Sequence, residues 1–350
     1  MRIKFLFPLL GLFLSCSLYQ DTDDPDIFFE YHDFDILPLG RTISDMIITE
    51  NNQSVFLTDY NNNSIIKIDV NSEMTVSGEI EIGSHPVALD LNSDNSVIVI
   101  ALEGESSIFT VETDQFQIIG EYSIPLMNVN DIVFFNDSIV VISSRTGPAC
   151  ISLNLNSTEY VNQSVLNGEL AMDQANKILY VATSSSVKKY NWDGERFSQD
   201  PNISDPYGFV GDVHHFVFNA TKNTIFACIS SSNDEESNIQ HIYSYSGSDM
   251  TFSGKYLIKS PGLAVAVTNN GNRVFTAPTD ADEIGVFIIE FDQESKLESY
   301  YYLSAGNLTD RGLVVDSNDQ NLYILVNIPG DDDSFEPYND YSFDLQRIKL

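Results

Sequence analysis

Charged side chains recur at corresponding positions of a repeated strand pattern in this 350-residue chain. A convergent group of carboxylates with histidine and arginine can perform acid–base chemistry, can bind a cation, or can simply line a polar channel. Aligning the first strands of the repeated units predicts that such a group meets at one channel mouth, with Asp212 and His214 as alternatives for one unit. The candidates are Asp45, His85, Asp131, Glu169, Asp212, His214 and Arg311.

Four aspartates in two later stretches are candidate Ca²⁺ ligands. Asp280 and Asp282 belong to an Asp-Ala-Asp-Glu sequence, and Asp331 and Asp333 to a Gly-Asp-Asp-Asp sequence. Hard carboxylate oxygens are the ligands that Ca²⁺ prefers, although neither stretch has EF-hand spacing. Solvated loops without a metal are the alternative interpretation, and no other cofactor is predicted. The chain has no GxSxG or HExxH sequence and no phosphate-binding glycine loop, so no complete catalytic motif stands out.

A repeated phrase indicates which elements must position these residues. A polar turn is followed seven times by an apolar strand, at a period of about 39 to 49 residues, which is the range for one propeller blade. The copies are NQSVFLTD, DNSVIVIA, NDSIVVIS, NKILYVAT, KNTIFACI, GNRVFTAP and DQNLYILV.

The second unit predicts four strands, at residues 87–91, 97–102, 107–113 and 120–125, separated by polar turns. We therefore predict an all-β, seven-bladed β-propeller of four-stranded antiparallel blades over residues 33–350. The loops that follow the second strand of each unit should share one face with the channel mouth. They are longer and more acidic in the last three units, which marks that face as a candidate site.

The ends of the chain predict how the ring closes. The last unit ends on its third strand at residue 350, and residues 33–38 alternate as a strand. We expect this N-terminal strand to pair with the C-terminal strand, because an open ring would leave an exposed edge.

Gly83, Pro86, Val87, Ala88 and the turn at 92–96 resemble the YVTN-type repeat of bacterial and archaeal surface propellers and lactonase-like propellers. Tyr-Val-Ala-Thr at 180–183 is the copy most similar to the tetrapeptide. The resemblance implies a propeller and leaves both a binding protein and a lactonase-like hydrolase open.

The N-terminus has the pattern of an export signal. Arg2 and Lys4 precede an apolar run at 5–14 that is too short to span a membrane. Phe-Leu-Ser-Cys at 13–16 resembles the lipobox of bacterial lipoproteins, with Phe13 in place of the usual leucine. This predicts a signal peptide at 1–15, lipidation of Cys16 and an acidic tether at 16–32, the alternative being an ordinary signal peptide. Cys150 and Cys228 are expected to be buried, unpaired thiols.

The formal net charge of −34 restricts the partners. Nucleic acids and anionic lipids are bound through Lys and Arg, so neither is expected, and the membrane is contacted only through the lipid anchor. Solubility alone is the other explanation for the acidity. We expect a monomeric cell-envelope propeller that binds a protein, glycan or cation through its acidic loop face, with a lactonase-like hydrolase and a surface-layer scaffold as alternatives.

Overall fold

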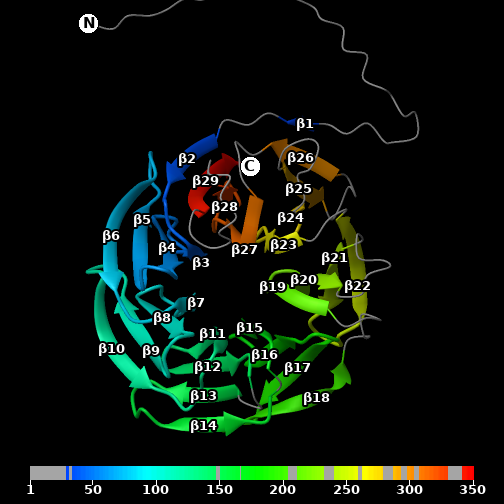
Figure 1. Ribbon diagram of the computed structural model, residues 1–350. Helices are drawn as coiled ribbons and strands as arrows, with labels where there is room; N and C mark the ends of the chain where they lie inside the picture. Colours follow the sequence, from blue (N-terminus) through cyan, green and yellow to red (C-terminus); the bar gives the residue numbers. More distant parts are fainter. Residues whose placement is uncertain are drawn as a thin grey trace, which may run out of the picture.

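The apolar runs form β-strands in the computed structural model. It describes residues 29–30, 34–146, 150–165, 167–203, 211–231, 240–258, 262–278, 287–292, 298–302, 307–329 and 341–350, and none of these residues lies in a helix. The strands form seven sheets that stand around a central channel, with one innermost strand from each sheet facing it (Figure 1). The predicted seven-bladed propeller is therefore confirmed.

Each blade runs outward from the channel as an antiparallel meander. Blades one to four contain β3 (Ile43–Ile48), β4 (Ser54–Asp59), β5 (Ser64–Asp69) and β6 (Thr75–Glu81); β7 (Pro86–Leu91), β8 (Val97–Leu102), β9 (Ser107–Glu112) and β10 (Gln117–Ser123); β11 (Val129–Asn136), β12 (Ile139–Ser144), β13 (Cys150–Asn154) and β14 (Tyr160–Gln163); β15 (Glu169–Asp173), β16 (Ile178–Ala182), β17 (Val187–Trp192) and β18 (Phe197–Ile203).

Blades five to seven complete the ring. They contain β19 (Gly211–Asn219), β20 (Thr224–Ser231), β21 (Gln240–Ser246) and β22 (Phe252–Ile258); β23 (Gly262–Val267), β24 (Arg273–Pro278), β25 (Phe287–Asp292), β26 (Glu298–Tyr302) and, outside it, β1 (Phe29–Glu30); β27 (Asn307–Val315), β28 (Asn321–Pro329), β29 (Tyr341–Lys349) and β2 (Phe34–Pro38).

The repeated polar phrase forms the turn between the first two strands of each blade. Asn52, Asn95 and Asn223 have positive φ angles of 57°, 61° and 49° in these turns. Asparagine tolerates the left-handed conformation because its short side chain can hydrogen-bond to the local backbone. Gly271 takes the same place in blade six, with φ of 72°. In these four blades the Asn or Gly of the turn thus reflects a backbone requirement.

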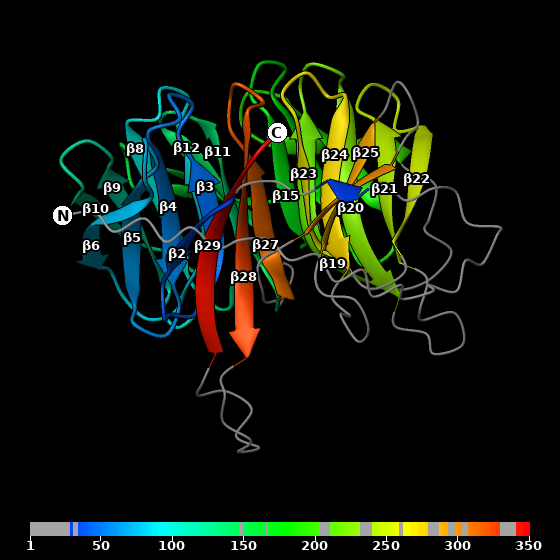
Figure 2. The same ribbon diagram turned by 90° about the horizontal axis from the view of Figure 1, so that it is seen from above.

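The predicted closure is confirmed by antiparallel pairing of β2 with β29. The register places Phe34 opposite Ile348 and Pro38 opposite Asp344. Arg347 of β29 forms an ion pair with Asp35 of β2, and its Nη1 atom donates to the carbonyl oxygen of Val70 at 2.7 Å. The seam therefore ties blade seven to its N-terminal strand and to blade one (Figure 2).

Phe29 and Glu30 form an element that we did not predict, since they lie in the stretch expected to be a tether. As β1 they pair in parallel with β26, opposite Tyr300 and Tyr301, and so extend blade six. The chain consequently passes the outer edge of blade six before it enters blade seven (Figure 1).

The apolar core lies between neighbouring blades. One buried cluster joins Tyr323 and Leu345 of blade seven to Val55 and Ile66 of blade one across the seam. Cys228 lies in the cluster between blades five and six. Cys150 and Cys228 are both buried, as expected, and burial raises the pKa of the Cys150 thiol to about 12. The part of the chain that the structure describes contains no helix long and apolar enough to cross a membrane.

Candidate ligand-binding funnel and the arginine cluster at its floor

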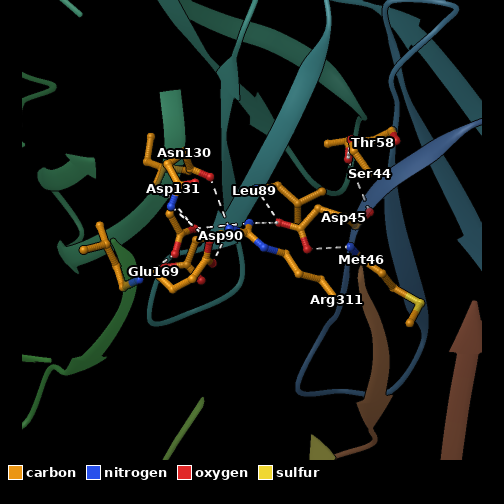
Figure 3. A network of polar contacts seen from close by, with 12 residues as sticks. Ser44, Asp45, Met46, Thr58, Leu89, Asp90, Asn130, Asp131, Glu169 and Arg311 are labelled. Atoms are coloured by element: carbon orange, nitrogen blue, oxygen red, sulfur yellow. Dashed lines mark hydrogen bonds and ion pairs between the residues drawn. The ribbon is translucent and has the colours of Figure 1, made fainter. Parts of the chain in front are cut away.

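Arg311 of β27 lies among carboxylates from three other blades (Figure 3). Its Nη1 atom lies 3.1 Å from Asp45 Oδ2 and 3.3 Å from Asp131 Oδ1, and its Nη2 atom forms an ion pair with Glu169. Nη2 also donates to the carbonyl oxygen of Asn130 at 3.1 Å. We call Arg311, Asp45, Asp131 and Glu169 the Arg311 cluster. The structure thus brings together four of the residues predicted from the sequence.

The carboxylates of the cluster also connect the blades directly. Asp45 Oδ2 accepts from the backbone N–H of Leu89 in the next blade at 3.1 Å, and Asp131 Oδ2 accepts from that of Leu170 at 2.7 Å. Each aspartate also accepts from the N–H that follows it in its own strand. These bonds hold the two aspartate carboxylates independently of Arg311. The innermost strands therefore form a rigid acidic ring.

Arg311 itself has a positive φ of 54°. A left-handed backbone at a non-glycine residue costs free energy and persists only where the surroundings determine it. The ion pairs to three other blades hold Arg311 in this conformation. The guanidinium is therefore held by contacts that come from distant parts of the sequence.

The single guanidinium of Arg311 is paired with three buried carboxylates in this cluster. Burial raises the pKa of Asp45 to about 6 and the pKa of Glu169 to about 7, against the opposing effect of Arg311. Burial also raises the pKa of Asp131. Burial alone would lower the pKa of Arg311, but the carboxylates raise it well above its usual value. The guanidinium stays charged, while Asp45 and Glu169 are able to titrate near neutral pH.

Two further groups belong to this ring and were missed in the sequence. Asp90 accepts from the N–H of Phe134 at 2.7 Å, and burial raises its pKa to about 7. His215 accepts from the N–H of Val265 through Nδ1, and burial lowers its pKa to about 3, so it is neutral. The signal for Asp90 was a single acidic residue within an otherwise apolar strand. His215 follows the candidate His214 directly, and nothing in the sequence distinguished it.

A cavity of about 1100 Å³, which we call the funnel, opens on one side of Arg311. A second cavity of about 460 Å³ lies on the other side and is lined by Asp45, Asp90 and Asp131. Arg311 and Glu169 line both cavities. The Arg311 cluster therefore forms a floor that divides the channel.

Three wall residues of the funnel occupy the same place in successive blades. Tyr60, Glu103 and Arg145 each follow the second strand of their blade, and each backbone N–H donates to the carbonyl group just before the first strand. Their side chains are connected, since the Tyr60 hydroxyl donates to Glu103 at 2.9 Å and Arg145 Nη1 lies 3.5 Å from Glu103. Alignment of the second strands, rather than of the first, would have identified them. In blades one to four, residues directly after the second strand line the funnel, as predicted.

The remaining candidate residues lie in different parts of the structure. His85 lies near the rim, stacked on Tyr60 with ring centroids 4.5 Å apart. His214 lines the funnel, and its Nδ1 atom lies 3.0 Å from Asp310 Oδ1. Asp212 lies on β19 opposite Ser230 in the strand pairing. The candidates that lie outside the described residues are Cys16, Asp280, Asp282, Asp331 and Asp333.

The described residues include no group of three His, Cys, Asp or Glu side chains placed to hold a metal ion together. The predicted acidic loops after β20, β24 and β28 fall at 232–239, 279–286 and 330–340, outside the described residues. The Ca²⁺ assignment therefore remains a prediction.

Comparison with known proteins supports the fold. No protein family and no curated protein matches the sequence. The structure is similar to hydrazine synthase of Kuenenia stuttgartiensis, with a TM-score of 0.64, 10% identity and coverage of 81% of this chain and 93% of that chain. It is also similar to U3-55K, with a TM-score of 0.65, 14% identity and coverage of 90% and 98%. The C-terminal WD40 domain of Sif2 gives a TM-score of 0.60 at 12% identity, with coverage of 87% and 81%. The chain is therefore a seven-bladed β-propeller with WD40-like structural neighbours. At these sequence identities the similarity shows the fold alone.

Proposed function

We propose that this protein is an exported propeller of the bacterial cell envelope that binds a protein, glycan or cation ligand in the funnel and at the acidic loops around it. The observation that carries the proposal is a funnel of about 1100 Å³ closed at its floor by the Arg311 cluster. Concave sites of this kind, with a few fixed polar groups, are where propellers and other scaffolds take ligands. The WD40-like neighbours are compatible with a binding role.

The lactonase-like alternative needs free acid–base groups around one cavity. His214, Asp131 and Glu169 were the candidates, but Asp131 lines the second cavity while His214 lines the funnel. Asp131 and Glu169 are both bound to Arg311. Carboxylates held by a guanidinium are poor bases for activating water, so the geometry favours binding over hydrolysis.

Thermal shift of residues 17–350 against neutral oligosaccharides, basic peptides, Ca²⁺ and lactones tests the proposal, because a ligand of the folded state raises the melting temperature. Ser184→Trp, which places a bulky ring in the funnel, should reduce the shift, and Thr221→Trp at the second cavity should preserve it. Lactone turnover that is lost in His214→Gln would instead establish the hydrolase. A shift with Ca²⁺ that is lost when Asp280, Asp282, Asp331 and Asp333 become Asn would support the metal assignment.

Lipidation of Cys16 is the second part of the proposal and rests on the lipobox-like sequence. Cys16→Ser should move the protein from the membrane fraction to the soluble fraction and abolish incorporation of labelled palmitate. Unchanged membrane association of this variant would contradict a lipid tether.

A further inference from the structure

The carboxylates of the funnel wall and floor that the structure describes already have partners. Glu103 lies by Arg145 and Asp310 by His214, and Asp45, Asp131 and Glu169 share Arg311. A polycation site would need unpaired carboxylates, which the described wall and floor do not offer. The funnel therefore suits a ligand that is polar and uncharged.

Two wall groups have hydrogen-bonding capacity of opposite kind. The buried Oδ1 atom of Asn327 accepts no hydrogen bond from the residues that the structure describes. Arg145 is bound through Nε to Asn130 and at 3.5 Å through Nη1 to Glu103, and its side chain is 58% exposed. Burying an acceptor without a donor costs free energy, and a ligand hydroxyl that donates to this acceptor offsets the cost. A ligand hydroxyl can also accept a hydrogen bond from arginine.

These two groups lie on opposite sides of the ring. Arg145 follows β12 of blade three, and Asn327 lies on β28 of blade seven, across the channel (Figure 1). Both line the funnel, whose volume exceeds the range of about 300 to 1000 Å³ for sites that enclose a drug-sized ligand. A ligand that contacts both must therefore be larger than one small ring.

The rim adds a fixed aromatic surface. The Tyr60 ring is held by its stacking on His85 and by its hydroxyl bond to Glu103. A fixed ring with an apolar face and a polar edge can cover the C–H face of a sugar while its hydroxyl group stays hydrogen-bonded.

From these four features we propose that the funnel binds a neutral oligosaccharide of several linked sugar units. The inference rests on the proposed binding function and specifies the ligand. Asn327 accepts from a sugar hydroxyl at one side of the funnel, Arg145 donates to another at the opposite side, and Tyr60 packs against a ring at the rim.

Isothermal titration of residues 17–350 with cellohexaose, maltohexaose and the hexamer of N-acetylglucosamine tests the inference, with hexalysine as the charged probe. At least one neutral hexamer should bind, and its Kd should change by less than about twofold between about 50 and 500 mM NaCl, because screening weakens only charged contacts. Arg145→Met and Asn327→Leu should each weaken binding by about tenfold. The control Arg196→Met removes a similarly exposed arginine, 59% accessible in its side chain and distant from the funnel, and should leave Kd unchanged.

Failure to bind any neutral hexamer at millimolar concentration would overturn the inference. Binding of hexalysine that declines with salt and is lost in Glu103→Gln would also overturn it, while the proposed binding function would stand. Lactone turnover without binding of either the neutral hexamers or hexalysine would overturn both this inference and the proposed binding function.

Discussion

Replacement of Arg311 by methionine tests whether the Arg311 cluster holds the ring together. The change keeps a long side chain but leaves Asp45, Asp131 and Glu169 without their cation in a site where the Arg311 side chain is only 12% exposed. Removing one partner of a buried ion pair typically costs about 3 to 5 kcal/mol, because the remaining charges stay buried and unpaired. We expect a loss of that size in the free energy of unfolding at pH 7.5.

Urea is the appropriate denaturant, since guanidinium ions can enter the vacated site. Arg145→Met is the matched control: it also removes one arginine from the funnel, but from an exposed pair, and should cost about 1 kcal/mol or less. The deficit of Arg311→Met should shrink between pH 7.5 and pH 5, because protonated carboxylates no longer need the cation. A few millimolar guanidinium chloride should stabilise this variant and not the wild type.

The reasoning would be refuted by an Arg311→Met protein that loses less than about 1 kcal/mol at pH 7.5. It would also be refuted by a loss that does not depend on pH. Either result would mean that the three carboxylates are solvated well enough to stay charged without Arg311.

Two further predictions concern pH and the seam. The pKa values of Asp45, Asp90 and Glu169 are raised in the folded protein, so their contribution to stability is fully present only below about pH 4 and is lost as the pH rises through about 6 to 7. Urea midpoints should therefore fall from pH 5 to pH 7.5, and Asp90→Asn should flatten this slope; an equally steep slope in the variant would contradict the assignment. Deletion of 341–350 removes β29 and with it the partner of both β28 and β2, so we expect the whole ring to lose cooperative unfolding, and a truncated protein with unchanged melting behaviour would disprove closure by this seam.

The fold was predictable because each blade carries its own local signals. The positive φ of Asn52 and Asn95 requires a residue that tolerates it, so the turn can be recognised in the sequence of these repeats. The apolar runs that follow must pack against neighbouring blades, and the unpaired third strand at the C-terminus required an N-terminal partner. β1 could not be predicted, because a two-residue parallel pairing to β26 leaves no periodic pattern in the sequence.

The candidate site was predictable only in part. Asp45, Asp131, Glu169 and Arg311 were found because they occupy the start of the innermost strand in different blades. Their pairing was not foreseen, since Arg311 is 266 positions from Asp45 and only ring closure brings them within 3.1 Å. The site predicted as one cluster is in fact divided by that pairing into the funnel and the second cavity.

The sequence by itself determined the seven blades, the closing strand and the face on which the loops meet, because each depends on turn chemistry and strand period that are local to a repeat. Only the tertiary structure decided which charged side chains pair with one another. Coulomb interactions between buried groups depend on distance and burial, and neither is encoded in any single repeat. Arg311 is therefore read from the sequence as one more polar residue at a channel mouth, and from the structure as the cation that closes the channel and forms the floor of the funnel.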